Sequence, residues 1–270
     1  MGREGNIVRV SGLRFSYGPK EVLRGVSLDV EAGHFYGLVG PNGCGKTTLL
    51  DLILGAKRPV SGSVLVRGKE AGGYNRRVLA RELALVPQEY HISFTFTVEE
   101  IILMGRHPYR GRLSSPSVRD RKIAEEVMER LELTPFRQRY ITRLSGGEKQ
   151  RVIFARALAQ DTRILLLDEA TSNMDIYYTF LCLRSVAEEV EKNGRTVIAT
   201  FHDLNLAGGF CDRMVFLKEG CAVAQGQTRD VLNAENVMDT FGVPCTIMTN
   251  PIDGTKQVFF KTNGRSETAH

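Results

Sequence analysis

The segment Gly40-Pro-Asn-Gly-Cys-Gly-Lys-Thr47 constrains the fold more than any other part of the chain. It fits the pattern G-x-x-x-x-G-K-[ST] and lies between an apolar run, His34–Val39, and a helical pattern, Thr47–Leu54. Glycines let the backbone wrap so closely that successive N–H groups point at phosphate oxygens, and the following helix adds the positive end of its dipole. The pattern therefore predicts an α/β fold with a phosphate-binding loop between a buried strand and a helix, rather than an ordinary glycine-rich turn.

Two side chains of this loop have specific expected roles. The Lys46 ammonium would neutralise the β- and γ-phosphates of a nucleotide, and the Thr47 hydroxyl would ligate Mg²⁺. The Cys44 thiol should lie close to the phosphates, and both a space-filling role and a redox role stay open for it. We expect the nucleotide to contact Gly40, Pro41, Asn42, Gly43, Cys44, Gly45, Lys46, Thr47 and Thr48.

The run Ile164-Leu-Leu-Leu-Asp-Glu169 supplies acidic groups that complement this loop. Four apolar residues predict a buried strand, and α/β sheets place their ligand sites at the carboxyl ends of such strands. Asp168 would hold the Mg²⁺ shell, and Glu169 would act as general base on the attacking water. An apolar run followed by two acids is more often a strand that runs out into solvent, but together with a phosphate loop it indicates a catalytic site.

Composition and charge narrow the class of protein. The chain has 270 residues, of which 42% are hydrophobic and 25% charged, which is typical of a folded globular protein. Its net charge of +5 is too dispersed to favour nucleic acid as a partner. Five scattered cysteines without a C-x-x-C pair indicate a reducing compartment. The N-terminus lacks the apolar core of a signal peptide, and no run approaches the ~20 apolar residues that span a bilayer, so we expect a cytosolic chain.

The order of strand and helix patterns predicts three parts. An α/β core with an N-terminal antiparallel β part is expected over residues 1–88 and 160–234, a helical insertion over 89–159, and a C-terminal appendage over 235–270 with a disordered polar end after Gly264. Alternation of strands and helices favours a parallel sheet. The expected strands are Ile7–Val10, Leu13–Tyr17, Val26–Val30, His34–Val39, Val64–Arg67, Ala84–Val86, Ile164–Leu167, Val197–Thr200, Met214–Lys218 and Cys221–Ala224, with mixed strand character over Val243–Phe260. The expected helices are Thr47–Leu54, Val98–Gly105 after a capping box at Thr97–Glu100, Arg119–Leu131, Glu148–Ala159 and Tyr177–Lys192.

A second glycine-containing motif, Leu144-Ser-Gly-Gly-Glu148, precedes Asp168. With it the chain resembles the ATP-binding subunits of ABC transporters, whose signature is LSGGQ or LSGGE. The resemblance extends over essentially the whole chain and implies a P-loop NTPase (RecA-like) core with an antiparallel β subdomain and an inserted α-helical subdomain. Ser145, Gly146, Gly147 and Glu148 open a helix, which makes a second anion-binding terminus. Two copies arranged head to tail would let each signature seal the ATP held by its twin.

Four further residues match motifs of this family. Tyr17, in Phe15-Ser-Tyr-Gly18, matches the aromatic residue that stacks on adenine, and Gln88 matches the glutamine that contacts Mg²⁺ and the attacking water. Asp175 matches the aspartate that crosses the dimer interface, and His202 matches the histidine that contacts the γ-phosphate. Each is an ordinary structural residue when taken alone. The chain departs from the family in Ser172-Asn-Met-Asp175, where Ala-Leu is usual, so the fine tuning of the interface is in doubt.

The stretch Gln88–Gly111 resembles importers of iron–siderophore, haem and cobalamin. The resemblance implies an Mg-ATP-hydrolysing subunit at the cytoplasmic face of a membrane, bound to a separate permease near Tyr90–Glu100 and served indirectly by a periplasmic or lipoprotein substrate-binding protein. An exporter subunit stays open as an alternative. A soluble, non-transport ABC ATPase would usually carry a long coiled coil or two cassettes, and a regulatory nucleotide binder would lack Glu169 or His202.

Overall fold

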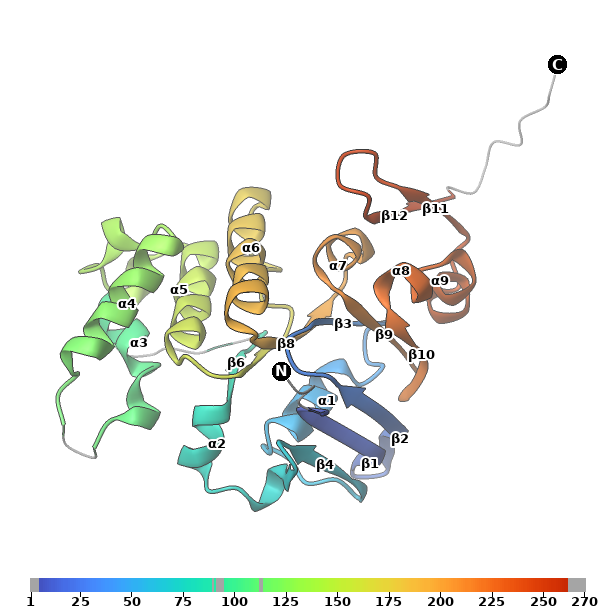
Figure 1. Cartoon of the computed structure of the whole chain (residues 1–270), viewed down its shortest axis with the longest axis horizontal. Helices are drawn as coiled ribbons and strands as arrows, with labels where there is room; N and C mark the ends of the chain where they lie inside the picture. Colours follow the sequence, from blue (N-terminus) through green and yellow to red (C-terminus); the bar gives the residue numbers. More distant parts are fainter. Residues whose placement is uncertain (1–4, 89, 91–94, 112–113, 262–270) are drawn as a thin grey trace.

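A central sheet of six strands organises the chain. The computed structural model describes residues 5–88, 90, 95–111 and 114–261. The strand order is β10-β9-β3-β8-β7-β6, and all neighbours pair in parallel except β9 and β10 (Figure 1). The strands are β3 (Phe35–Val39), β6 (Leu83–Val86), β7 (Ile164–Leu167), β8 (Thr196–Phe201), β9 (Arg213–Lys218) and β10 (Cys221–Gln227). The carboxyl ends of the five parallel strands therefore meet at one edge.

A smaller antiparallel sheet has the order β2-β1-β4-β5. Its strands are β1 (Val8–Tyr17), β2 (Lys20–Val30), β4 (Ser61–Val66) and β5 (Lys69–Glu70). The two runs expected at residues 7–10 and 13–17 are one continuous strand. Gly12 has a φ of 54°, and the β1–β2 register shifts between Val10 and Leu13, so an irregularity absorbs the break without ending the strand.

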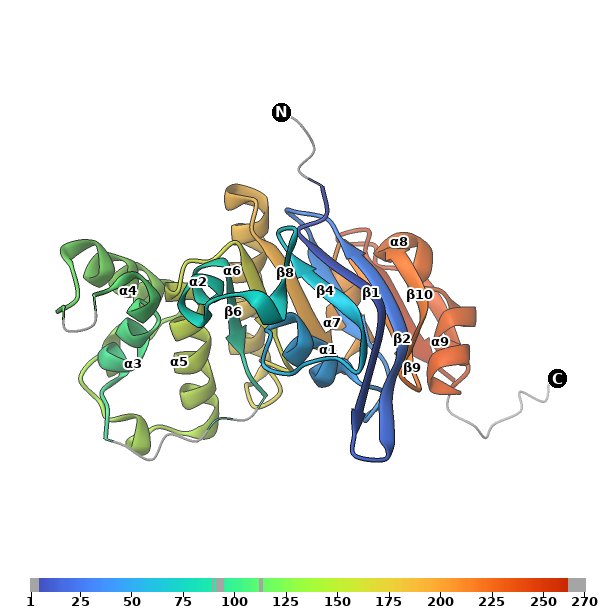
Figure 2. The same cartoon turned by 90° about the horizontal axis from the view of Figure 1, so that it is seen from below.

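Helix α1 (Lys46–Ile53) lies between the two sheets (Figures 1 and 2). Strand β3 shows how the core is divided, because successive side chains of a strand point to opposite faces. Tyr36 and Leu38 join the apolar cluster around α1, whereas Phe35 and Val39 join the cluster on the other face of the central sheet. This burial on both faces explains why the central strands are almost continuously apolar.

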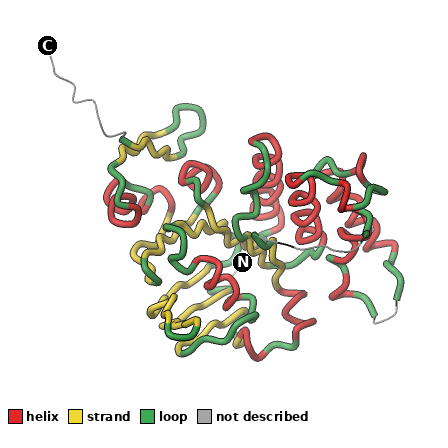
Figure 3. The backbone as a smooth tube through the Cα atoms, turned by 180° about the vertical axis from the view of Figure 1, so that it is seen from behind, coloured by secondary structure: helices red, strands yellow, loops and turns green. Residues whose placement is uncertain are grey.

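Helices gather at one end of the molecule and over the second face of the central sheet (Figure 3). Helices α3 (Val98–Met104), α4 (Val118–Arg130) and α5 (Gly146–Ala159) pack on one another, and α6 (Ile176–Asn193) and α7 (Leu204–Phe210) follow. The capping box predicted at Thr97 and Glu100 is confirmed. The proposed boundaries after residues 88 and 159 stay a prediction.

The C-terminal part consists of α8 (Thr228–Val231), α9 (Ala234–Phe241) and the hairpin of β11 (Cys245–Thr249) and β12 (Lys256–Phe260). The amide side chain of Asn205 on α7 donates to Val258 O and accepts from Val258 N, which fixes the hairpin against α7. The expected disordered end after Gly264 lies outside the described residues. No described helix has the length and apolar character needed to span a bilayer.

Helices α7, α8 and α9, one further helix, the short strand β5 and several short turns had no counterpart in the expected pattern. Helix α2 (Arg76–Glu82) has a single buried residue, Leu79, so it shows little apolar periodicity. The 3₁₀ turns are η1 (Ala71–Gly73), η2 (His107–Tyr109), η3 (Thr134–Phe136) and η4 (Ile141–Arg143).

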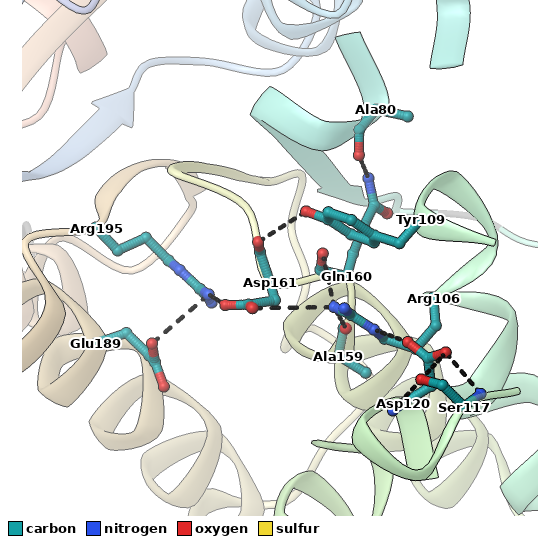
Figure 4. Close-up of polar contacts among 10 residues, drawn as sticks. All are labelled: Ala80, Arg106, Tyr109, Ser117, Asp120, Ala159, Gln160, Asp161, Glu189 and Arg195. Carbon is teal, nitrogen blue, oxygen red and sulfur yellow. Dashed lines mark hydrogen bonds and ion pairs between the residues drawn. The ribbon is translucent and has the colours of Figure 1, made fainter. Parts of the chain in front are cut away.

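A buried ion pair holds the C-terminal end of α5 (Figure 4). Arg106 donates from Nε to Asp120 Oδ1 at 3.0 Å and from Nη1 to the Ala159 carbonyl at 2.8 Å. Asp161, just before β7, accepts from Arg195 at 3.3 Å, and Tyr109 donates to the Asp161 carbonyl at 3.0 Å. These contacts join α4, α5 and the strand β8 side of the sheet, far along α5 from Ser145.

Candidate functional site

The loop Gly40–Thr47 connects β3 to α1 and requires glycine at two points. A Cβ atom at Gly40 would lie 2.1 Å from the carbonyl oxygen of Leu217, and one at Gly45 would lie 2.5 Å from Leu23 Cδ2. Gly45 also has a φ of 107° where it precedes the first residue of α1. A side chain at either position would collide with the surrounding structure, so the loop requires glycine at both.

Lys46 is held by the loop itself. Its side chain is 5% exposed, and Nζ donates to the carbonyls of Gly40 at 2.8 Å and Pro41 at 3.2 Å. No ion pair of Lys46 is found within the described part of the chain. Because these partners are neutral, the positive charge of the ammonium stays available for an anion.

Asp168 follows β7 and faces the first turn of α1. Its Oδ1 accepts hydrogen bonds from the hydroxyls of Thr47 at 3.1 Å and Thr200 at 2.9 Å. Burial raises the pKa of the Asp168 carboxyl, and the two hydroxyls lower it. No cationic side chain forms an ion pair with this buried carboxylate among the described residues, so a bound cation would stabilise its charged form.

This donor set fits Mg²⁺ bound together with phosphate. No group of three or more His, Cys, Asp or Glu side chains suited to a metal ion occurs among the described residues. A carboxylate and a hydroxyl, from Asp168 and Thr47, are what Mg²⁺ uses when substrate phosphates and water complete its shell. The described residues therefore offer a partial set of Mg²⁺ ligands rather than a dedicated all-protein cage.

Glu169 is held in an unusual backbone conformation and contacts two expected site residues. Its φ is +45°, which is uncommon outside glycine and is enriched at functional sites. Oε2 accepts from Gln88 Nε2 at 2.5 Å, and Oε1 lies 2.5 Å from His202 Nε2. The Glu169 N–H donates to Thr200 Oγ1 at 2.8 Å. Sequence reasoning missed Thr200, although its place near the carboxyl end of β8, beside β7, is a usable signal.

One pocket of about 440 Å³ brings together the side chains of Lys46, Thr47, Gln88, Glu169 and His202. Asp168 lies behind Thr47 and is not among the lining residues. Tyr17 lies at the rim of this pocket with half of its surface exposed. Its ring makes a T-shaped contact with the ring of Phe15, and the two ring centroids are 4.9 Å apart. Lys20 and Val22, on the strand after Tyr17, were not expected. The lining residues are Tyr17, Lys20, Val22, Asn42, Gly43, Gly45, Lys46, Thr47, Thr48, Gln88, Glu169 and His202.

Cys44 lies under the loop rather than in the pocket. It is 5% exposed, and burial raises the pKa of its thiol. The thiolate is the reactive form of cysteine, so this environment favours the space-filling role.

The second group of expected residues does not line this pocket. Ser145 caps α5 in a capping box, in which its N–H donates to Glu148 Oε2 at 2.7 Å. Gly146 and Gly147 form the first turn of α5. Asp175 caps α6 by accepting from Tyr178 N at 3.0 Å. One copy of the chain therefore holds the expected site residues in two separate groups.

A comparison with protein families decides the affiliation. Residues 23–172 match the family model described as ABC transporter. The chain belongs to the ABC transporter family. The match includes the phosphate loop, the 144–148 motif and Asp168–Glu169, so the three motifs belong to one ABC cassette.

Curated ABC relatives include importer subunits. The chain is 36% identical to the cobalamin import ATP-binding protein of Halobacterium salinarum over 92% of its own length, but it spans only 62% of that relative. It is 32% identical to the ferric enterobactin transport ATP-binding protein of Escherichia coli, over 94% of both chains.

Solved ABC structures confirm the expected fold class. A metal-chelate type ABC transporter in an inward-facing conformation superposes with a TM-score of 0.80 at 29% identity, covering 95% of this chain and 97% of that one. A bacterial ABC transporter cassette solved as a dimer gives a TM-score of 0.74 at 28% identity, covering 82% of this chain and 99% of that one.

Proposed function

We propose that this chain is the ATP-binding and ATP-hydrolysing subunit of an importer for a metal chelate, such as an iron–siderophore, haem or cobalamin. The observation that carries the proposal is the contact of Glu169 with Gln88 and His202 beside the Lys46 loop. Relatives named for cobalamin and ferric enterobactin transport support the substrate class.

ATP would lie with its triphosphate in the loop and its adenine against Tyr17. Loop N–H groups and the Lys46 ammonium bind the β- and γ-phosphates. Thr47, Asp168 and Gln88 would hold Mg²⁺, which supplies positive charge to the phosphate oxygens when bound. The half-exposed ring of Tyr17 offers a flat apolar surface to the base.

Hydrolysis would use Glu169 as general base. A water oxygen attacks the γ-phosphorus, its proton passes to the Glu169 carboxylate, and the bond from the γ-phosphorus to the bridging oxygen breaks to release ADP. Gln88 would orient the water and His202 would contact the γ-phosphate. Both already touch the carboxylate in the single chain.

The complete site would need a second copy of the chain. Ser145, Gly146, Gly147 and Glu148 open α5, away from the pocket, so they would serve the γ-phosphate of the partner, with Asp175 crossing the same interface. The related cassette solved as a dimer supports this arrangement.

The membrane partner would be a separate permease at the cytoplasmic face of a membrane, with a substrate-binding protein acting on its far side. We place the permease contact near Tyr90–Glu100, of which residues 91–94 lie outside the described residues. The partner determines specificity, because the transported compound would never touch this chain.

A Glu169→Gln variant tests the assigned chemistry. It should bind ATP as the natural chain does and lower kcat by about a hundredfold or more, because the base is lost and the shape is kept. Phosphate release and binding of a fluorescent ATP analogue measure the two effects.

Lys46→Ala serves as the contrasting variant, since it should weaken ATP binding itself by about tenfold or more. Unchanged turnover in Glu169→Gln would refute the role of the base. Normal nucleotide affinity in Lys46→Ala would refute the phosphate loop.

A further inference from the structure

Arg151, on α5, is a buried cation that lacks, among the described residues, the hydrogen bonds and ion pairs that usually accompany a buried charge. Its side chain is 1% exposed, and its Nε and Nη1 atoms are buried without a hydrogen-bond partner in the described part of the chain. Burying a charged group without such partners is costly, and each case in a native fold calls for a reason. No carboxylate in the described residues forms an ion pair with it.

The guanidinium instead lies on the face of an aromatic ring. Its central carbon is 3.7 Å from the ring centroid of Tyr178, while Phe136 is farther away at 5.8 Å. Cation–π attraction is strongest where water is excluded, as it is here. Tyr178 lies in the first turn of α6 and donates its backbone N–H to the side chain of Asp175.

Two other contacts join α5 to residues 170–178, the segment that contains Asp175 and Tyr178. Gln150, which is fully buried, donates from Nε2 to the Ala170 carbonyl at 3.0 Å. At Gly147, an added Cβ would lie 3.0 Å from the carbonyl oxygen of Asn173. The first two turns of α5 therefore pack along the whole stretch from Ala170 to Tyr178, and Arg151 provides the contact at its far end.

We propose that Arg151 is a positioning residue. Through its contact with Tyr178 it holds the start of α5 against residues 170–178, which include Asp175. Ser145 and Asp175 then reach the partner's ATP as one rigid unit. The inference rests on the proposed function, because it assumes that both residues act across a dimer. It assigns Arg151 no contact with nucleotide.

The test is an Arg151→Met variant, which keeps the length and apolar stem of the side chain but removes the charge. A buried charge can often be replaced by an apolar residue without loss of stability. We therefore expect an unchanged or higher unfolding temperature and unchanged affinity of the single chain for a fluorescent ATP analogue. We expect kcat for phosphate release to fall about tenfold or more, as the loss of a desolvated cation–π contact implies.

Tyr178 offers a matched pair of variants. Tyr178→Phe keeps the ring and should retain the natural kcat, whereas Tyr178→Leu should reproduce the loss seen in Arg151→Met. Both should bind the ATP analogue normally.

The possible outcomes separate the inference from the proposed function. Natural kcat in Arg151→Met, or a loss matched by a lower unfolding temperature, overturns the positioning role, as does equal activity of the two Tyr178 variants. If the natural chain itself releases no phosphate from ATP, the proposed function fails first. An active natural chain with a stable, slow Arg151→Met variant supports both.

Discussion

Asp168 shows how a single side chain is held ready for a cation. Its carboxyl group is buried, which raises its pKa, and the hydroxyls of Thr47 and Thr200 offset only part of the cost. A group whose pKa is higher in the folded than in the unfolded chain destabilises the fold once the pH rises above its unfolded pKa. The nucleotide-free chain thus carries a local cost that a bound cation would remove.

Replacing Asp168 by Asn should therefore raise the unfolding temperature of the nucleotide-free chain near pH 7, since the buried charge is gone. As the pH falls through the raised pKa, the natural carboxyl becomes protonated and the advantage of the variant should shrink. Thermal unfolding of both proteins between pH 4 and 8 measures this, because the range begins at about the usual pKa of Asp and extends above it. A variant less stable than the natural chain at pH 7 would contradict the argument.

Most residues around the pocket follow from sequence spacing, and a few do not. Lys46, Thr47 and Asp168 lie in motifs whose chemistry dictates their place. The sequence does not reveal that Thr200 joins Asp168 to the Glu169 backbone, because that contact depends on β7 and β8 being neighbours. Nor does the sequence reveal the positive φ of Glu169, because glutamate seldom adopts the left-handed region.

At the scale of elements, α5 is fixed at its far end by Arg106. The Arg106 and Asp120 side chains are 4% and 8% exposed, and Arg106 also caps the carbonyl of Ala159 in the last turn of α5 (Figure 4). Breaking a buried pair leaves one charge without compensation, which costs far more than the pair contributes.

An Arg106→Met variant should lower the free energy of unfolding by about 3–5 kcal/mol, because Asp120 stays buried without its partner. Urea unfolding followed by circular dichroism measures the change. Lys122→Met is the control on the exposed side of the same helix, since the Lys122–Glu126 pair is 75% and 55% exposed and should matter by less than about 1 kcal/mol. Equal losses in the two variants would show that burial of the pair is irrelevant.

Elements with strong periodicity were predictable, and weakly patterned ones were not. The apolar runs of β7 and β8 and the capping box before α3 are local signals. Helix α2 escaped prediction because only Leu79 is buried, and the break at Gly12 suggested two strands where sheet pairing makes one. In both cases tertiary contacts outweigh local preference.

For the whole molecule, the separation of the pocket from Ser145 leads to a prediction about assembly. In the Glu169→Gln background, ATP should convert the 30.1 kDa chain to a species of twice that mass in light scattering. Adding Ser145→Asp should return it to a monomer, because Asp still caps α5 but repels the γ-phosphate. The affinity for ATP should stay within about threefold.

Ser117→Asp provides the control, because Ser117 caps α4 in the same kind of capping box and is expected to lie outside the interface. Its ATP-dependent dimer should persist. A double variant, Glu169→Gln with Ser145→Asp, that still dimerises fully would speak against the shared site. The sequence predicted this pairing, because two phosphate-binding motifs that lie far apart in one chain can meet across a dimer. The packing of the 96 residues between Thr48 and Ser145 could not be predicted from the sequence.

The contacts of Glu169 have a consequence for how the isolated subunit behaves between cycles. Both oxygens of this carboxylate are already engaged, one by the amide of Gln88 and the other by the ring of His202. A water molecule arriving at the pocket must compete with two neighbours before it can give up a proton. We therefore expect the isolated subunit to hydrolyse ATP slowly, because Glu169 can accept a proton from water only after one of these contacts has opened.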